Sequence, residues 1–197
     1  RMNYELSGNL PPEIGNLTEL KIISLESNNI IGSLPPEIGN LEKLEELKLS
    51  SNNMTGNIPE EIGKMVHLQT LALKGNNISG ALPLSIIKLK DMEWMYLSSN
   101  QLNGNIPEGF GEMIKFKYLN LSNNQFSGSI PSGIGDLEAL QYLNLANNQF
   151  SGSIPSELGR LNIYRLNLEF NQLTGKIPRD LGNLSNLVHL NLESNKL

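Results

Sequence analysis

The sequence NNQFSGSIPS at residues 123–132 returns letter for letter at residues 147–156, an offset of 24 residues. Self-similarity at one fixed period of about 20–50 residues indicates a repeat protein. A shorter marker, Gly-x-(Ile/Leu)-Pro, carries the period along the chain in steps of 24 residues with a last step of 23. It begins at Gly8, Gly32, Gly56, Gly80, Gly104, Gly128, Gly152 and Gly175.

A second marker, Leu-x-Leu-x-x-Asn-x-apolar, recurs with the same period, and isoleucine or methionine replaces a leucine in some units. Its alternation of apolar and polar residues predicts a short half-buried strand in each unit. The asparagine amide has two N–H donors and an acceptor, so we expect it to bond the backbone of neighbouring coils where the chain turns. The expected ladder is Asn28, Asn52, Asn76, Asn100, Asn124, Asn148, Asn171 and Asn195.

The rest of each unit predicts an extended segment followed by a short helix. Proline lacks an amide N–H, which favours an edge or extended position. The apolar–Gly–x–Leu segment that follows, such as Ile38, Gly39 and Leu41, predicts one helical turn that ends at the glycine. One unit cannot bury its apolar face alone, whereas stacked units bury it continuously. We therefore predict a single domain over residues 1–197, an α/β repeat solenoid of about eight 24-residue repeats.

The pattern L-x-x-L-x-L-x-x-N-x-L-x-G-x-I-P resembles the plant-specific class of leucine-rich repeats, and the resemblance covers almost the whole chain. It implies a curved solenoid with a parallel β-sheet on the concave face and short helical turns on the convex face. It also implies a short second strand near Gly-x-Ile-Pro. Known members of this class are mostly ectodomains of plant receptor-like kinases and receptor-like proteins, and they include inhibitors of cell-wall polygalacturonases.

The chain departs from the class pattern in several places. Members usually carry cysteine-paired caps, and this chain has no cysteine. Arg1 and Tyr4 stand where the first unit should have leucine and asparagine, and the last unit stops at Leu197. Uncapped solenoid ends expose their core, so we expect a segment of a longer protein. Ile87 replaces the glycine of one helical turn, and one residue is missing around residues 161–163, where we expect irregular curvature.

Composition argues against several classes of function. The net charge is −5 and the basic residues are scattered, so the footprint of a nucleic-acid-binding protein is absent. No apolar run approaches the roughly 18 residues of a membrane span. The only histidines, His67 and His189, stand in different units, and there is no thiolate for a metal site. We therefore expect no metal, no cofactor and no catalytic set of nucleophile, base and orienting group, and hence no enzyme.

The candidate binding residues stand at the outward positions of the predicted strands, which form columns across stacked coils about 4.8 Å apart. In the column six residues before each ladder asparagine, Trp94, Tyr118 and Tyr142 are consecutive, and Tyr96 stands beside them in the next column. Exposed aromatic clusters supply large contact areas and dominate binding hot spots. The alternative is that these rings stack along the sheet and stabilise it. The two roles are compatible.

The neighbouring positions give weaker predictions. Asn120, Asn144, Asn167 and Asn191 form a column that either bonds a peptide backbone or is a solvated feature of the repeat. Arg165 and His189 extend the aromatic column. An arginine there can take a ligand carboxylate. Some peptide-sensing plant receptors have an Arg-x-Arg pair on such a strand, and here Asn167 leaves that pair incomplete. Phe170 either makes an exposed contact or covers the one-residue deletion.

Asn-x-(Ser/Thr) sequons begin at Asn16, Asn53, Asn77, Asn120 and Asn183. They permit N-glycosylation, although an asparagine-rich repeat produces several of them by its own pattern. A glycan on Asn120 would crowd the aromatic cluster. If the cluster binds a ligand, we therefore expect Asn120 to be bare, and Asn16, Asn53, Asn77 and Asn183 remain the candidate glycosylation sites.

Three functional hypotheses follow. The leading one is an extracellular or cell-surface recognition module that binds a protein or peptide ligand through its concave face, with a co-receptor as a second partner. The alternative is a scaffold subunit docked in a larger, intracellular assembly, which the lack of cysteine favours. A lesser alternative is a cell-wall enzyme inhibitor or an ice-binding protein. Ice binding usually needs a flat array of regular small residues, whereas threonine is rare here and the columns are irregular.

Overall fold

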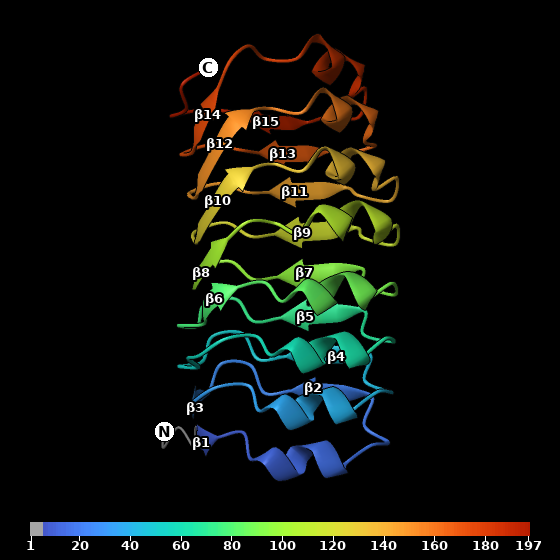
Figure 1. Ribbon diagram of the computed structural model, residues 1–197, viewed down its shortest axis with the longest axis vertical. Helices are drawn as coiled ribbons and strands as arrows, with labels where there is room; N and C mark the ends of the chain where they lie inside the picture. The colour runs from blue at the N-terminus through green and yellow to red at the C-terminus, as the bar shows by residue number, and fades with distance from the viewer. Residues whose placement is uncertain (1–5) are drawn as a thin grey trace.

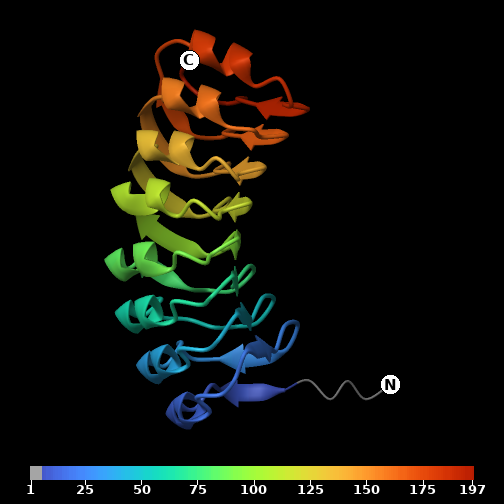
Figure 2. The ribbon, with the colours of Figure 1, turned by 90° about the vertical axis from the view of Figure 1, so that its right-hand side faces the viewer.

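The computed structural model describes residues 6–197, so Arg1 and Tyr4 of the degenerate first unit lie outside the described residues. Over the described range the chain forms one stack of coils in sequence order, and the stack is curved (Figure 1; Figure 2). The fold is the predicted repeat solenoid. The strands of its largest sheet line the concave side and its short helices the convex side (Figure 2).

The concave sheet is parallel and has eight strands in the order β15-β13-β11-β9-β7-β5-β4-β2. Each strand holds three residues, and its central, inward side chain is the first apolar residue of the Leu-x-Leu marker. The strands are β2 (Ile22–Ser24), β4 (Glu46–Lys48), β5 (Thr70–Ala72), β7 (Trp94–Tyr96), β9 (Tyr118–Asn120), β11 (Tyr142–Asn144), β13 (Arg165–Asn167) and β15 (His189–Asn191).

The second strand near Gly-x-Ile-Pro is also present, as the family resemblance implies. A two-stranded parallel sheet joins β1 (Ser7–Asn9) to β3 (Asn29–Ile31). A five-stranded parallel sheet contains β6 (Ser79–Ala81), β8 (Gln101–Gly104), β10 (Gln125–Ser129), β12 (Gln149–Ser153) and β14 (Gln172–Thr174). Between the two sheets the Asn53 N–H still donates to the Ile30 carbonyl at 2.8 Å. Backbone bonding therefore continues along this side of the stack.

The predicted helical turns are five-residue 3₁₀ helices on the convex side. They are η1 (Pro12–Asn16), η2 (Pro36–Asn40), η3 (Glu60–Lys64), η4 (Leu84–Lys88), η5 (Glu108–Glu112), η6 (Ser132–Asp136), η7 (Ser156–Arg160) and η8 (Arg179–Asn183). The prediction that the glycine ends the turn was wrong. Gly39 lies inside η2, and the turn is closed by the Leu41 N–H, which donates to the Ile38 carbonyl at 3.1 Å.

Close contact between coils explains this glycine. A Cβ atom added to Gly39 would lie 2.4 Å from the carbonyl oxygen of Glu61 in the next coil. Only a residue without a side chain lets the two backbones come this near. At Ile87, where the glycine is replaced, the facing residue in the next coil is Gly109, and a Cβ atom added to Gly109 would lie 2.9 Å from Ile87 Cδ1. In this contact the glycine therefore stands in the next coil, at Gly109, and the side chain stands at position 87.

The one-residue deletion at residues 161–163 is absorbed in the connection after η7. Leu161 leaves that helix in an extended conformation with ψ of 151°, whereas Leu137 leaves η6 with ψ of 75°. The sheet register is kept across the deletion, because Tyr142 pairs with Arg165 as it pairs with Tyr118 on its other side. The deletion therefore leaves the concave columns aligned.

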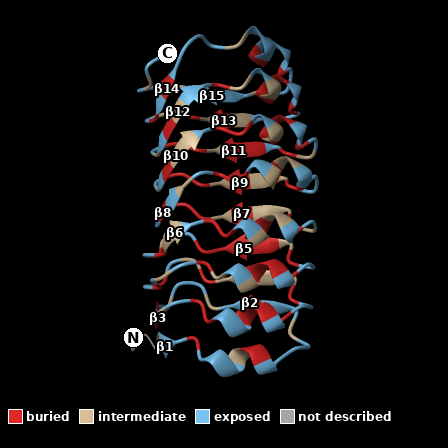
Figure 3. Cartoon of the chain, in the orientation of Figure 1, coloured by how far each residue is buried: buried red, intermediate tan, exposed pale blue. Residues whose placement is uncertain are grey.

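The core runs through the stack between the strands and the helices (Figure 3). Its largest fully buried side chains are phenylalanines, and Phe126 stacks on Phe150 with ring centroids 6.2 Å apart. At the two ends of the stack, apolar residues such as Leu17 and Leu190 are exposed, although their counterparts in inner coils are buried. These positions lack a covering coil within residues 6–197.

The asparagine ladder is confirmed at all eight positions. Asn76 is typical: its Oδ1 accepts from the Met54 N–H, and its Nδ2 donates to the carbonyls of Leu49 and Leu73, each at 3.0 Å. The same pattern, in which the asparagine Oδ1 accepts from a backbone N–H 22 or 21 residues upstream, recurs along the stack. Each side chain therefore ties its own turn to the preceding coil.

Candidate binding face

The concave sheet presents its outward side chains in the columns that the sequence predicted. In β4, β7, β9 and β13 the central residue is buried and both neighbours are partly exposed. Strand pairing aligns Trp94 with Tyr118, Tyr118 with Tyr142, and Arg165 with His189. Tyr96 is aligned with Asn120. The candidate residues therefore occupy neighbouring positions on one face.

Trp94, Tyr96, Tyr118 and Tyr142 form what we call the aromatic row. The rings of Tyr118 and Tyr142 stack with centroids 4.0 Å apart and an interplanar angle of 5°. Tyr96 reaches diagonally to Tyr118, with centroids 4.7 Å apart. The rings therefore stack along the sheet, as the stabilising role predicted. Trp94, Tyr96 and Tyr118 nevertheless remain partly exposed, as a binding role requires.

Tyr142 differs from the prediction of an exposed residue, because only 8% of it is accessible. The Tyr118 ring covers one side, the Arg165 guanidinium carbon lies 5.8 Å from the Tyr142 ring centroid, and the Tyr164 ring centroid lies 6.3 Å away. Tyr142 is thus covered at its end of the row, and the accessible aromatic surface comes from the other three rings.

A cation lies against the ring at either end of the row. The Lys117 Nζ is 5.0 Å from the Trp94 ring centroid and forms an ion pair of 2.6 Å with Glu93. At the other end, the Arg165 guanidinium lies over the Tyr142 ring. The Arg165 Nε is buried without a hydrogen-bond acceptor among residues 6–197. A cation near an aromatic ring face is attracted to the π-electrons. These contacts hold the rings in one orientation, which reduces the entropy lost on binding.

Burial raises the pKa of Tyr118 above its ordinary value of 10.0, and the hydroxyl of Tyr142 beside it raises the pKa further. Burial likewise raises the pKa of Tyr96. A phenol taken out of water disfavours its charged form. Both hydroxyls therefore stay neutral to a higher pH than an exposed tyrosine would.

This shift predicts a late tyrosine ionisation in an alkaline titration followed by phenolate absorbance. We expect one phenol of the folded wild type to ionise well above pH 10, and Tyr118→Phe to remove that step. Because the folded pKa is raised, the unfolded state loses its proton first, so stability falls as the pH rises through and beyond 10. Tyr118→Phe should lessen that fall. A titration in Tyr118→Phe that keeps the late step would show that another tyrosine is responsible.

The asparagine column is engaged by its own chain. The Oδ1 atoms of Asn120, Asn144 and Asn191 accept from the backbone N–H two residues later, at 3.0–3.1 Å. Asn144 also donates to the Tyr142 hydroxyl at 3.2 Å. These amide oxygens are therefore occupied. Bonding to a peptide backbone, which remains a prediction, would fall to the amide N–H groups.

Phe170 is exposed to 47% and has a left-handed φ of 52°. Its counterparts in other coils, such as Asn123 and Asn147, have nearly the same φ. Asparagine tolerates this region, whereas an aromatic residue there is unusual. The exposure agrees with a contact residue. The deletion that Phe170 was alternatively expected to cover is taken up elsewhere, at Leu161.

Sequence analysis missed Tyr164 and Lys117 as neighbours of the row. Both stand seven residues before a ladder asparagine, one position outside the strands. That position otherwise holds charged or glutamine side chains in most units, so a tyrosine at 164 was the available signal.

Among the sequons, Asn16, Asn53, Asn77 and Asn183 are exposed, whereas Asn120 is partly buried.

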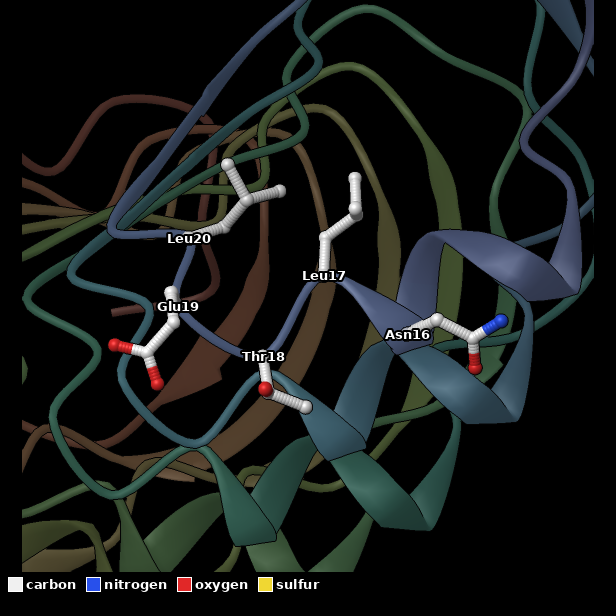
Figure 4. Close-up of a pocket in the computed structure, with 5 residues that line it drawn as sticks. All are labelled: Asn16, Leu17, Thr18, Glu19 and Leu20. Atoms are coloured by element: carbon white, nitrogen blue, oxygen red, sulfur yellow. The ribbon is translucent and has the colours of Figure 1, made fainter.

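A hollow at the first coil lies outside the concave strands. It has a volume of about 390 Å³ and is lined by residues 16–20, with Leu17 and Leu20 among them (Figure 4). Their counterparts Leu41 and Leu44 are fully buried, so this hollow is the open end of the core. Residues 6–197 contain no group of three or more histidine, cysteine or acidic residues placed to hold a metal. They also contain no helix long and apolar enough to cross a membrane.

Comparison with known families identifies the repeat. A sequence profile described as leucine-rich repeat matches residues 18–78 and 90–150, and a second leucine-rich repeat profile matches residues 162–184. The chain belongs to the leucine-rich repeat family. Among curated proteins, a sequence search finds no match to the chain.

Several of the solved structures similar to this leucine-rich repeat chain are plant receptors. The plant peptide hormone receptor RGFR1 in complex with RGF2 is 35% identical, with a TM-score of 0.94 over 97% of this chain and 35% of that one. The Arabidopsis receptor kinase HAESA, in complex with the peptide hormone IDA and the co-receptor SERK1, is 33% identical, with a TM-score of 0.93 over 97% and 32%.

A third similar structure is the leucine-rich repeat ectodomain of the Arabidopsis thaliana membrane receptor kinase GASSHO1/SCHENGEN3, in complex with CASPARIAN STRIP INTEGRITY FACTOR 2. It is 35% identical, with a TM-score of 0.85 over 97% of this chain and 26% of that one. The chain therefore spans about a third or less of each receptor. The predicted resemblance to plant receptor ectodomains is confirmed.

Proposed function

We propose that this leucine-rich repeat chain is a recognition module that binds a peptide or protein ligand on its concave face. The observation that carries the proposal is the aromatic row, in which Trp94, Tyr96 and Tyr118 remain partly exposed while cations and stacked rings hold them in place. Rigid, partly exposed aromatic residues are the usual energetic centre of an interface. Arg165 and the amide N–H groups of Asn120 and Asn144 lie beside it and would contact the polar parts of the ligand.

The similar receptors support this proposal. RGFR1 is a peptide hormone receptor in complex with RGF2. HAESA is in complex with the peptide hormone IDA and with the co-receptor SERK1. By analogy, the protein acts outside the cell or at its surface without catalysing a reaction, and it uses a co-receptor as a second partner. Under this proposal the exposed sequons Asn16, Asn53, Asn77 and Asn183 carry glycans, and Asn120 on the binding face is bare.

The alternative of an intracellular scaffold rests on the absence of cysteine from the 197 residues. It also uses a protein-binding surface, so the location of the protein and the class of partner distinguish the two roles. The lesser alternative of ice binding is less well supported, because the concave columns mix aromatic, charged and amide side chains. Inhibition of a cell-wall enzyme would be one case of protein binding.

The test uses a phage-displayed library of random linear peptides selected on the folded chain. We expect Trp94→Ala and Tyr118→Ala each to weaken the selected peptides by about 30-fold, the effect of a hot spot of about 2 kcal/mol. Ile114→Ala is the matched control, because Ile114 is 63% exposed and lies outside the concave strands. Peptide binding that survives both aromatic substitutions, with unchanged circular dichroism, would rule out the aromatic row as the site.

A further inference from the structure

The concave face has a second feature next to the aromatic row, at strand β5. Thr70 and Ala72 are the outward residues of β5, and both are small and buried. Their neighbours in the sheet are larger: Thr70 lies between Glu46 and Trp94, and Ala72 lies between Lys48 and Tyr96. The result is a hollow of about 350 Å³, which we call the β5 hollow.

The two sides of the β5 hollow differ in chemistry. On the β4 side, the Lys48 Nζ and a Glu46 carboxylate oxygen form an ion pair of 2.5 Å, and this bond raises the pKa of Lys48. On the β7 side stands Tyr96, which belongs to the aromatic row. A side chain that entered here would meet an aromatic ring on one side and a charged pair on the other.

Lys74 supplies the charge that distinguishes this hollow. It lines the hollow, it is exposed, and no ion pair joins it to any residue within 6–197. Lys48 lines the same hollow, so two ammonium groups flank its small-residue floor. Two acidic groups lie near these ammonium groups. Glu26 also lines the hollow, Glu46 is already paired with Lys48, and neither forms an ion pair with Lys74. The unpaired cation makes an anionic group the favoured occupant.

We propose that the β5 hollow is a subsite for an aspartate or glutamate side chain of the ligand. The carboxylate would lie between Lys74 and Lys48, and the carbon atoms of the same side chain would pack on Tyr96 and Ala72. This inference rests on the proposed function, because it assigns one residue of the peptide that the aromatic row binds.

The geometry also sets the spacing in the ligand. The hollow is one to two coils from Trp94 and Tyr118, which corresponds to about 5–10 Å at the usual strand separation. An extended peptide that crosses the strands rises by about 3.3 Å per residue. The acidic residue therefore stands about two or three positions from the apolar residue that contacts the aromatic row.

The experiment uses the peptides selected on the wild-type chain. We expect them to contain aspartate or glutamate two or three positions from an apolar residue. We expect Lys74→Glu to weaken their binding by about tenfold or more. A peptide with lysine in place of the acidic residue should then bind Lys74→Glu more tightly than it binds the wild type. Lys88→Glu in η4 on the convex side is the matched control with the same change of charge.

A second variant, Ala72→Leu, fills the hollow without changing any charge and should also weaken binding, with circular dichroism unchanged. If peptides depend on Trp94 but show no acidic preference and tolerate both Lys74→Glu and Ala72→Leu, the subsite is wrong and the proposed function stands. If the wild type selects no peptide, or only peptides that ignore Trp94→Ala, the proposed function and the subsite both fail.

Discussion

Replacing Asn76 by alanine is expected to lower the free energy of unfolding by about 3 kcal/mol or more. The substitution removes three hydrogen bonds at once and leaves the N–H of the fully buried Met54 without an acceptor. The two carbonyls suffer less, because Leu49 also accepts from Asn52 and Leu73 also accepts from Asn100. An orphaned buried N–H costs about 1–3 kcal/mol, and the lost bonds add to that.

The measurement is urea unfolding followed by far-ultraviolet circular dichroism, together with hydrogen exchange of the Met54 amide. Asn40→Ala is the control, since Asn40 is an exposed asparagine at the end of η2. Asn76→Asp should also destabilise the chain, because it keeps an acceptor for Met54 but loses both donors and buries a charge. Equal midpoints for Asn76→Ala and Asn40→Ala would show that the ladder bonds add nothing to stability.

The second large effect is expected at Gly135, where alanine should destabilise the chain by about 3 kcal/mol. A Cβ atom there would lie 2.3 Å from the backbone oxygen of Glu157, and backbone atoms cannot move aside as a flexible side chain can. The coils that carry η6 and η7 would have to separate, and the packed apolar contacts between them would be lost.

Gly133, two residues earlier in the same helix η6, is the matched control. Its added Cβ would find nothing nearer than the Glu108 oxygen at 3.5 Å, which is ordinary contact. Gly133→Ala should therefore raise stability by about 0.4–1 kcal/mol, because it restricts the unfolded chain. The two substitutions are chemically identical and should shift the urea midpoint in opposite directions. Shifts of the same sign would contradict the close-contact explanation.

The repeating sequence pattern predicted the parts of this fold that depend only on the repeat period. The columns and the eight ladder asparagines follow from positions counted along the sequence, whereas the parallel sheet and the second strands were implied by the resemblance to plant-specific leucine-rich repeats. The helical-turn glycine was misread, because the pattern shows a glycine at that place but not that the next backbone lies against it. Local turn chemistry and contact between coils favour the same residue for different reasons.

The candidate site was less predictable for a related reason. A column gives the order of side chains but not their tilt, so the burial of Tyr142 and the diagonal contact of Tyr96 with Tyr118 could not be read from it. The bonds of Asn120 and Asn144 to their own backbone are likewise set by local rotamers. The β5 hollow depends on small residues between large ones, and the sequence marks small residues less clearly than aromatic ones.

The ladder also bears on how such a chain can lengthen. Asn124 bonds the carbonyls of Leu97 and Leu121, and Asn148 bonds those of Leu121 and Leu145, so each reaches back by one coil only. A gene segment that encodes one period can therefore be duplicated in frame, and the added coil finds every partner already in place. The identical decapeptides at residues 123–132 and 147–156 are what a copying event of this kind leaves behind.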